Sequence, residues 1–237
     1  MQKRTYVVFL SLCLILFLCF SIPLSNGNNS KPLAVDATLD AKPVIVIDCG
    51  HGGEDGGAVS SDGVLEKDIN LKIGLVLEKF FLQGGFKVRM IRREDISVYD
   101  DSAETLREKK VSDLHKRAEI CNSDSRNIYI SIHQNKFEDS KYYGTQVFYS
   151  KNNPESKELA ECIRAAVKGL LQNENERKCK EATKDIYVLD NAQVPAVIVE
   201  CGFLSNYEET QKLLTDEYRN QLAYSIYSGF LEYYYAL

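Results

Sequence analysis

Residues 44–57 read VIVIDCGHGGEDGG, a run of branched apolar residues that leads directly into a glycine-rich loop. An unbroken apolar run of this length is typical of a strand buried on both faces, as in a parallel sheet. Glycines just beyond such a strand let the backbone adopt positive φ and approach a bound species closely. In open α/β sheets, ligands bind outside the carboxyl ends of the strands. We therefore expect His51 to be a metal ligand, presented from this loop at the end of the first core strand.

Strand-like and helix-like stretches alternate along the rest of the chain. Strands are expected at residues 44–48, 86–91, 127–133, 145–149, 186–189 and 196–200. Helices are expected at residues 66–83, 112–121, 154–171, 207–214 and 217–234. The charged segments 92–110 and 173–184 are expected to be solvated loops. This order predicts an α/β fold, a three-layer domain with a central, mostly parallel twisted sheet flanked by helices.

The first residues have the composition of a targeting segment. Two basic residues precede an uncharged apolar run from Tyr6 to Phe20, which a small-residue stretch follows. This layout is typical of a secretory signal peptide, and an uncleaved anchor through residues 6–22 is the alternative. We expect residues 1–27 to be this signal peptide or N-terminal anchor, residues 28–42 a linker, and residues 43–237 an exported catalytic domain.

The bulk composition is that of a globular protein. Of the 237 residues, 44% are hydrophobic and 27% are charged, and the net charge of −5 argues against nucleic acid as a partner. Beyond residue 27 the chain has an odd number of cysteines and no CxxC pair, so no disulfide framework is expected. For Cys49 and Cys201, a role as small buried apolar residues is favoured over a metal-ligand or redox role.

Histidine is rare in this chain, which contains three. His51 and His133 stand at the carboxyl ends of expected buried strands, whereas His115 lies in an expected polar helix. A single histidine at a strand end is more often structural than a ligand, but two at one sheet edge favour a metal site. Catalytic zinc takes three protein ligands and keeps a fourth position for water. A third ligand is therefore expected from a carboxylate.

Several carboxylates lie near these histidines in the expected fold. Glu66 opens the helix after the glycine loop, so its side chain points back towards the first strand's end. Glu200 ends an apolar strand, where a charge is costly unless it meets a cation or a proton. Asp48 is expected to orient a histidine or brace the loop, and Glu54 and Asp55 are weaker candidates.

Together these residues predict a hydrolytic metal site, with His51, Glu66 and His133 as ligands and Glu200 as general base. Each carboxylate taken alone could equally be a helix cap or part of a salt bridge. The combination of all four is the stronger indication.

Four motifs of the chain resemble the zinc-dependent N-acetylmuramoyl-L-alanine amidases. They are DCGHGGEDGGA at 48–58, EKDINL at 66–71, SIHQN at 131–135 and VECGFLSN at 199–206. The family's TRxxD element stands here as IRRED at 91–95, with Ile91 in place of threonine. The resemblance covers about residues 44–234, and four motifs in the right order make it specific.

The resemblance implies zinc ligands at His51, Glu66 and His133 and a catalytic glutamate at Glu200. It implies hydrolysis of the amide between N-acetylmuramic acid and L-alanine, which strips stem peptides from the glycan strands of peptidoglycan. Glu200 would take the proton of the attacking water and pass it to the leaving amine. Such an enzyme works outside the cytoplasm, at the cell wall or in the forespore intermembrane space.

The segment at 136–143 is too short for the helix that blocks the site in larger relatives. A single minimal domain behind one signal segment is most similar to the sporulation and germination amidases, which act with a deacetylase to form muramic-δ-lactam in spore cortex. A vegetative cell-wall amidase is an alternative, as is a non-catalytic wall-binding protein. A zinc carboxypeptidase is another, with Arg92, Arg93 or Arg177 at a terminal carboxylate.

No wall-binding module is visible beside the expected domain. A small acidic domain has little to hold it on an anionic wall. We therefore expect localisation or activation to depend on a protein partner or on the N-terminal segment, which is the expected contact with a membrane.

Overall fold

The computed structural model describes residues 42–236, which belong to one compact unit. The expected signal segment and all but the last residue of the expected linker lie outside the described residues. Among residues 42–236, no helix combines the length and the apolar composition needed to cross a membrane.

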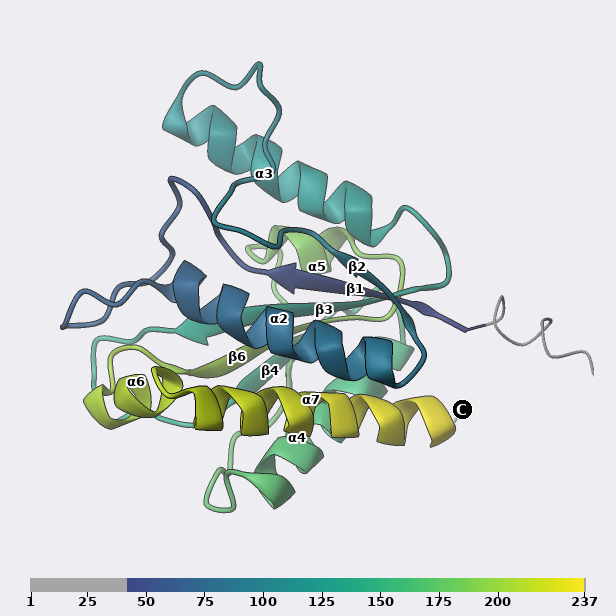
Figure 1. Ribbon diagram of the computed structural model, residues 1–237. Helices are drawn as coiled ribbons and strands as arrows, with labels where there is room; N and C mark the ends of the chain where they lie inside the picture. The colour runs from purple at the N-terminus through teal and green to yellow at the C-terminus, as the bar shows by residue number, and fades with distance from the viewer. Residues whose placement is uncertain (1–41, 237) are drawn as a thin grey trace, which may run out of the picture. The chain divides into compact units, whose positions relative to one another are not determined.

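A six-stranded sheet forms the middle layer, with strand order β2-β1-β3-β6-β4-β5 (Figure 1). The strands are β1 (Val44–Cys49), β2 (Lys87–Met90), β3 (Asn127–Asn135), β4 (Gln146–Tyr149), β5 (Lys180–Glu181) and β6 (Ala196–Phe203). Neighbouring strands pair in parallel except β4 and β6, which are antiparallel. The carboxyl ends of β1, β3 and β6 therefore meet at one edge of the sheet.

Helices cover both faces of this sheet (Figure 1). One face carries α2 (Glu66–Gln83), α4 (Glu155–Leu170), α6 (Tyr207–Leu213) and α7 (Asp216–Ala236). The other carries α3 (Leu106–Cys121) and the short α5 (Tyr187–Asn191). The predicted three-layer α/β fold with a mostly parallel sheet is confirmed.

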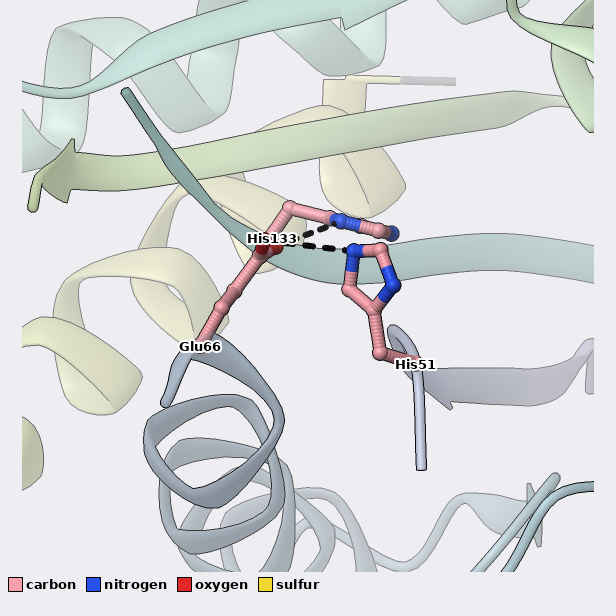
Figure 2. A group of neighbouring side chains, drawn as sticks. All are labelled: His51, Glu66 and His133. Atoms are coloured by element: carbon pink, nitrogen blue, oxygen red, sulfur yellow. Dashed lines mark hydrogen bonds and ion pairs between the residues drawn. The ribbon is translucent and has the colours of Figure 1, made fainter. Parts of the chain in front are cut away.

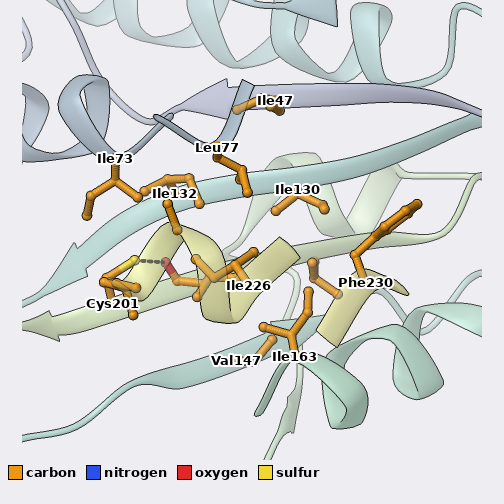
Figure 3. Close-up of a cluster of buried hydrophobic side chains, with 14 of the residues drawn as sticks. Ile47, Ile73, Leu77, Ile130, Ile132, Val147, Ile163, Cys201, Ile226 and Phe230 are labelled. Carbon is orange, nitrogen blue, oxygen red and sulfur yellow. Dashed lines mark hydrogen bonds between the residues drawn. The ribbon is translucent and has the colours of Figure 1, made fainter. Parts of the chain in front are cut away.

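The core follows from the alternation of side chains along the strands. Ile47 of β1 and Ile130 of β3 point towards α2 and α7, where they join Leu77 and Phe230 in the larger cluster (Figure 3). The intervening residues, such as Tyr129 of β3, face α3 and α5 instead. Because successive residues alternate between faces, continuous apolar runs are needed to fill both layers. Each fully buried branched side chain contributes about 1.5–3 kcal/mol of transfer free energy.

Two expected elements differ in the structure. Helix α3 begins at Leu106 and not at Ser112, because Thr105 and Glu108 form a reciprocal capping box that starts it earlier. Residues 186–189 were expected to form a strand, but they belong mainly to helix α5, whose Val188 and Leu189 pack on the sheet. A four-residue apolar run has no readable period, so tertiary packing decides its conformation. Other predicted elements agree to within a few residues, apart from the unpredicted two-residue β5 and the extension of β6 to Phe203.

Candidate metal centre

Two histidines and one glutamate converge at the sheet edge where β1 and β3 end (Figure 2). His51 follows β1, His133 lies in β3, and Glu66 is the first residue of α2. One potential ligand atom from each residue lies within 4.8 Å of the others. The two imidazole rings have centroids 5.0 Å apart. These are the three residues that the sequence predicted as metal ligands.

The Glu66 carboxylate lies between the two rings. Its Oε2 is 3.2 Å from His51 Nε2, and its Oε1 is 2.9 Å from His133 Nδ1. Oε2 also accepts a hydrogen bond from the Ala58 backbone N–H, and Oε1 accepts one from that of Gln134. Burial raises the pKa of Glu66, but the hydrogen bonds with both histidines outweigh it and hold the pKa well below its usual range. The carboxylate is thus fixed and negatively charged.

The glycine loop brings the His51 ring to this carboxylate. His51 has φ of +62°, and it is the one non-glycine residue with positive φ in residues 42–236. Such a backbone conformation costs free energy and is common at functional sites. Arg92, which is buried, holds the loop by donating to the carbonyl oxygens of Cys49 and Gly50. The expectation that 92–110 is wholly a solvated loop is therefore wrong at its first residue, and also at residues 106–110, which belong to α3.

Two aspartates hold the loop and its histidine in place. Asp55 Oδ2 is 2.9 Å from His51 Nδ1, which leaves Nε2 facing Glu66. Carboxylates that contact the far nitrogen of a ligating histidine fix its tautomer and its orientation. Asp48 is buried and accepts hydrogen bonds from Arg117, Tyr129 and Ser131.

Arg117 continues this bracing network. Its Nη2 donates to the backbone oxygen of His51 at 3.0 Å, and Nη1 donates to that of Cys49. Of the two roles expected for Asp48, the structure therefore supports bracing the loop. Asp55 is the residue that orients a histidine. Glu54 is not part of the cluster and pairs with Lys109 at the surface.

Glu200 lies next to this cluster on β6, directly opposite His133 in the β3–β6 register. Its Oε2 is buried and has no hydrogen-bond partner among the described residues. Burial raises the pKa of Glu200 to about 7. A buried carboxyl oxygen without a partner is costly unless something else meets it.

The cluster fits a metal ion. Two imidazoles and a carboxylate are a donor set that transition metals such as zinc accept, and both histidines are partly exposed. Asp55 and Glu66 together raise the pKa of His51 to about 9 although burial lowers it, so the surroundings favour positive charge at this place. These three residues could therefore hold a cation.

Comparison with known proteins places the chain in a family. The family model described as N-acetylmuramoyl-L-alanine amidase matches residues 45–232. The chain belongs to the N-acetylmuramoyl-L-alanine amidase family. The germination-specific N-acetylmuramoyl-L-alanine amidase of Bacillus subtilis (strain 168) is 33% identical over 233 residues, 98% of this chain and 96% of that protein.

Solved structures agree with this assignment. One is the CwlD amidase from Clostridioides difficile in complex with the GerS lipoprotein, with 40% identity and a TM-score of 0.79. That match covers 83% of this chain and 100% of that chain. An N-acetylmuramoyl-L-alanine amidase from Clostridium difficile 630 has 30% identity and a TM-score of 0.71, covering 82% of this chain and 98% of that chain. The family resemblance read from the motifs is confirmed, and with it the expected enzyme class.

Other predictions around the candidate site have separate outcomes. His115 lies apart from the cluster and stacks on Tyr187 at the outer surface. Cys49 and Cys201 are fully buried in the larger core cluster, as expected of small apolar residues. Sequence reasoning missed Arg117, because nothing in the polar helix 106–121 indicates that one of its arginines reaches the end of β1.

Proposed function

We propose that this protein is a zinc-dependent amidase that cuts the bond between N-acetylmuramic acid and L-alanine in spore cortex. Its products would be glycan units that a partner enzyme converts to muramic-δ-lactam, which germination needs. The supporting observation is the His51, Glu66 and His133 cluster with the unpaired Glu200 carboxyl beside it. The germination-specific relative, matched over nearly its whole length, supports the spore role.

In the proposed mechanism, His51, Glu66 and His133 hold the zinc ion. A zinc ion in such a site supplies activation of water and polarisation of the amide carbonyl. Asp55 keeps His51 Nδ1 engaged, so that Nε2 stays available. Glu200 accepts the proton of the attacking water on its partnerless oxygen and delivers it to the alanine nitrogen as that nitrogen leaves.

The test is Glu200→Gln, assayed on purified muropeptides by mass spectrometry with zinc content measured in parallel. We expect near-complete loss of activity while zinc stays bound, because Glu200 is not one of the three ligands. Glu119→Gln, an exposed glutamate on α3, is the matched control and should keep wild-type activity. Release of peptides with a free L-alanine amine supports the amidase proposal. Removal of residues from the other end of the peptide would support a carboxypeptidase. No cleavage at all would support a non-catalytic wall-binding protein.

We also propose that the enzyme acts outside the cytoplasm and depends on a protein partner there. The support is the solved structure of the CwlD amidase from Clostridioides difficile, which is in complex with the GerS lipoprotein. The purified chain should then degrade intact sacculi poorly when alone. Full activity on sacculi at physiological concentration, without any partner, would contradict this proposal. Complementation of spores that lack their germination amidase separates the cortex role from a vegetative one.

A further inference from the structure

Arg177 is an arginine with an unusual set of contacts. It lies between α4 and β5, and its guanidinium carbon is 4.4 Å from the centroid of the Phe203 ring. Its Nε donates to the Tyr143 backbone oxygen at 2.7 Å, and its Nη1 is 3.5 Å from Gln146 Oε1. These contacts fix the plane of the guanidinium on an aromatic surface. Among residues 42–236, its Nη2 donates to no acceptor, and no carboxylate lies within ion-pair distance.

The buried arginines among residues 42–236 either pair with a carboxylate or have an acceptor at every guanidinium nitrogen. Arg117 pairs with Asp48 and Asp113, Arg219 pairs with Asp216, and Arg92 donates to four different backbone oxygens. Arg177 is half-buried and has neither, because it forms no ion pair and its Nη2 has no acceptor among residues 42–236. A guanidinium held flat, with one nitrogen free of acceptors, is suited to a carboxylate, to which it can donate charge-assisted hydrogen bonds.

The position of Arg177 connects it to the candidate metal centre. Gln146 of β4 pairs directly with Glu200 of β6 in the antiparallel register. Residues opposed in this way have β-carbons about 4.5–5.5 Å apart and side chains on the same face of the sheet. Since Gln146 contacts Arg177, a single side chain separates the guanidinium from the proposed base. A substrate bound at Glu200 can reach Arg177 within about two extended residues, at roughly 3.3–3.6 Å per residue.

A second basic group lies on the same side of the sheet. The Lys180 ammonium is 6.0 Å from the centroid of the Phe148 ring, and Phe148 pairs with Ile198 on β6, two residues before Glu200. Lys180 is exposed and has no ion pair within the part of the chain that the structure describes. Glu209 feels the charge of Arg177 but forms no ion pair with it, and its two oxygens accept from the backbone N–H groups of Gly144 and Phe203. In a chain of net charge −5, two cations without an ion pair beside the site favour an anionic ligand there.

We propose that Arg177, on its Phe203 platform, binds a carboxylate of the wall peptide one residue beyond the alanine at the cut bond. Lys180 adds to the attraction at longer range. This proposal rests on the proposed amidase function and deepens it, because it makes the enzyme selective for peptides with a negative charge at this position. The side chain acts on substrate binding and takes no part in proton transfer.

The test compares two muropeptides that differ in one group. Each has N-acetylmuramic acid linked to L-alanine and then to glutamate, with the α-carboxyl of that glutamate either free or converted to a carboxamide. For the wild-type enzyme we expect a kcat/KM at least roughly 10-fold higher on the free acid, since charge-assisted hydrogen bonds are strong. Arg177→Gln should lose that preference, mostly through KM, and should leave the carboxamide substrate almost unaffected.

Two further variants make the result decisive. Arg177→Lys keeps the positive charge but lacks the planar guanidinium, so it should retain part of the preference for the free acid. Arg107→Gln removes an exposed arginine on α3 and should leave both substrates unchanged.

Each outcome has one meaning. Equal wild-type rates on acid and carboxamide overturn the proposal, and this comparison stands even if Arg177→Gln does not fold. Equal losses on both substrates in Arg177→Gln overturn it too, because they indicate a structural role. If the wild-type enzyme cuts neither substrate at the alanine bond, the proposed function fails instead.

Discussion

Gly50 and His133 lie so close together that a β-carbon at residue 50 would be 2.2 Å from Nε2 of the imidazole. Gly57 is similar, since its β-carbon would be 2.5 Å from Glu66 Oε2 and 2.7 Å from His51 Cδ2. These two glycines therefore give room to the candidate ligands themselves. The sequence suggested that the loop's glycines make room for a bound species, and the structure adds this more local reason.

Gly50→Ala should displace the His133 ring and weaken metal binding. We expect a loss of zinc affinity of roughly 10- to 100-fold or more, comparable to losses from disturbed second-shell contacts. Zinc titration with a competing chelator measures this. Gly169→Ala is the control, because nothing lies within 4 Å of a β-carbon there. It should keep zinc affinity and, being in a helix, add about 0.5–1 kcal/mol of stability. Unchanged zinc affinity in Gly50→Ala would show that the ring can move at no cost.

Asp55→Asn should also weaken zinc binding, through His51. The carboxylate contacts Nδ1 at 2.9 Å and favours the tautomer with its proton on Nδ1. The unprotonated Nε2, which faces Glu66, is then available as a ligand. An amide has the same shape but no charge, so we expect a loss of zinc affinity of roughly 10- to 100-fold. Glu54→Gln, one residue earlier, breaks only an exposed pair with Lys109 and should change affinity little. Equal effects in the two variants would mean that loop charge matters and the contact with His51 does not.

Much of the fold could be predicted because its signals are local and redundant. The apolar run of β1 and the helical period of α2 each have one interpretation. Helix α3 was placed too late, although Thr105 and Glu108 carry a readable capping signal. Residues 186–189 could not be assigned correctly, because the packing of Val188 and Leu189 on the sheet decides their conformation.

The candidate site could be predicted where sheet topology brings residues together. His51 follows β1 and His133 lies near the carboxyl end of its parallel neighbour β3, so their convergence follows from the fold class. The supporting contacts could not be predicted, because they join elements far apart in the sequence. Arg117 reaches Asp48 across 69 residues, and Arg177 contacts Gln146 across 31.

The Asp48 and Arg117 pair predicts how stability depends on pH. Burial raises the pKa of Asp48, but Arg117, His133, Tyr129 and Ser131 outweigh it, so the pKa lies below the ordinary value of 3.8. A carboxyl whose pKa is lowered by folding stabilises the protein above its unfolded pKa and loses that contribution as pH falls through the folded value. The free energy of unfolding should therefore decrease as the pH falls below 3.8.

Asp48→Asn tests this dependence. It should cost about 3–5 kcal/mol at neutral pH, because it removes one partner of a buried ion pair. It should also flatten the pH dependence below pH 3.8, measured by urea unfolding across a pH series. Asp101→Asn, at an exposed position, should keep the wild-type profile. An unchanged slope in Asp48→Asn would mean that other carboxylates cause the acid sensitivity.

Gly229→Ala should destabilise the fold without touching the site. Gly229 lies where α7 crosses α4, and a β-carbon there would be 2.5 Å from Ile163 Cα and 2.7 Å from the Cys162 backbone oxygen. Backbone atoms cannot move aside as a flexible side chain can, so the helices must separate, at a cost of about 1–3 kcal/mol. Thermal unfolding measures this cost, with Gly169→Ala on α4 as the control that adds a methyl group in open space. Zinc affinity should stay at the wild-type value in the folded protein, because this contact lies on helices that carry no candidate ligand. A melting temperature equal to that of the wild type would mean that the two helices can shift apart without loss of packing.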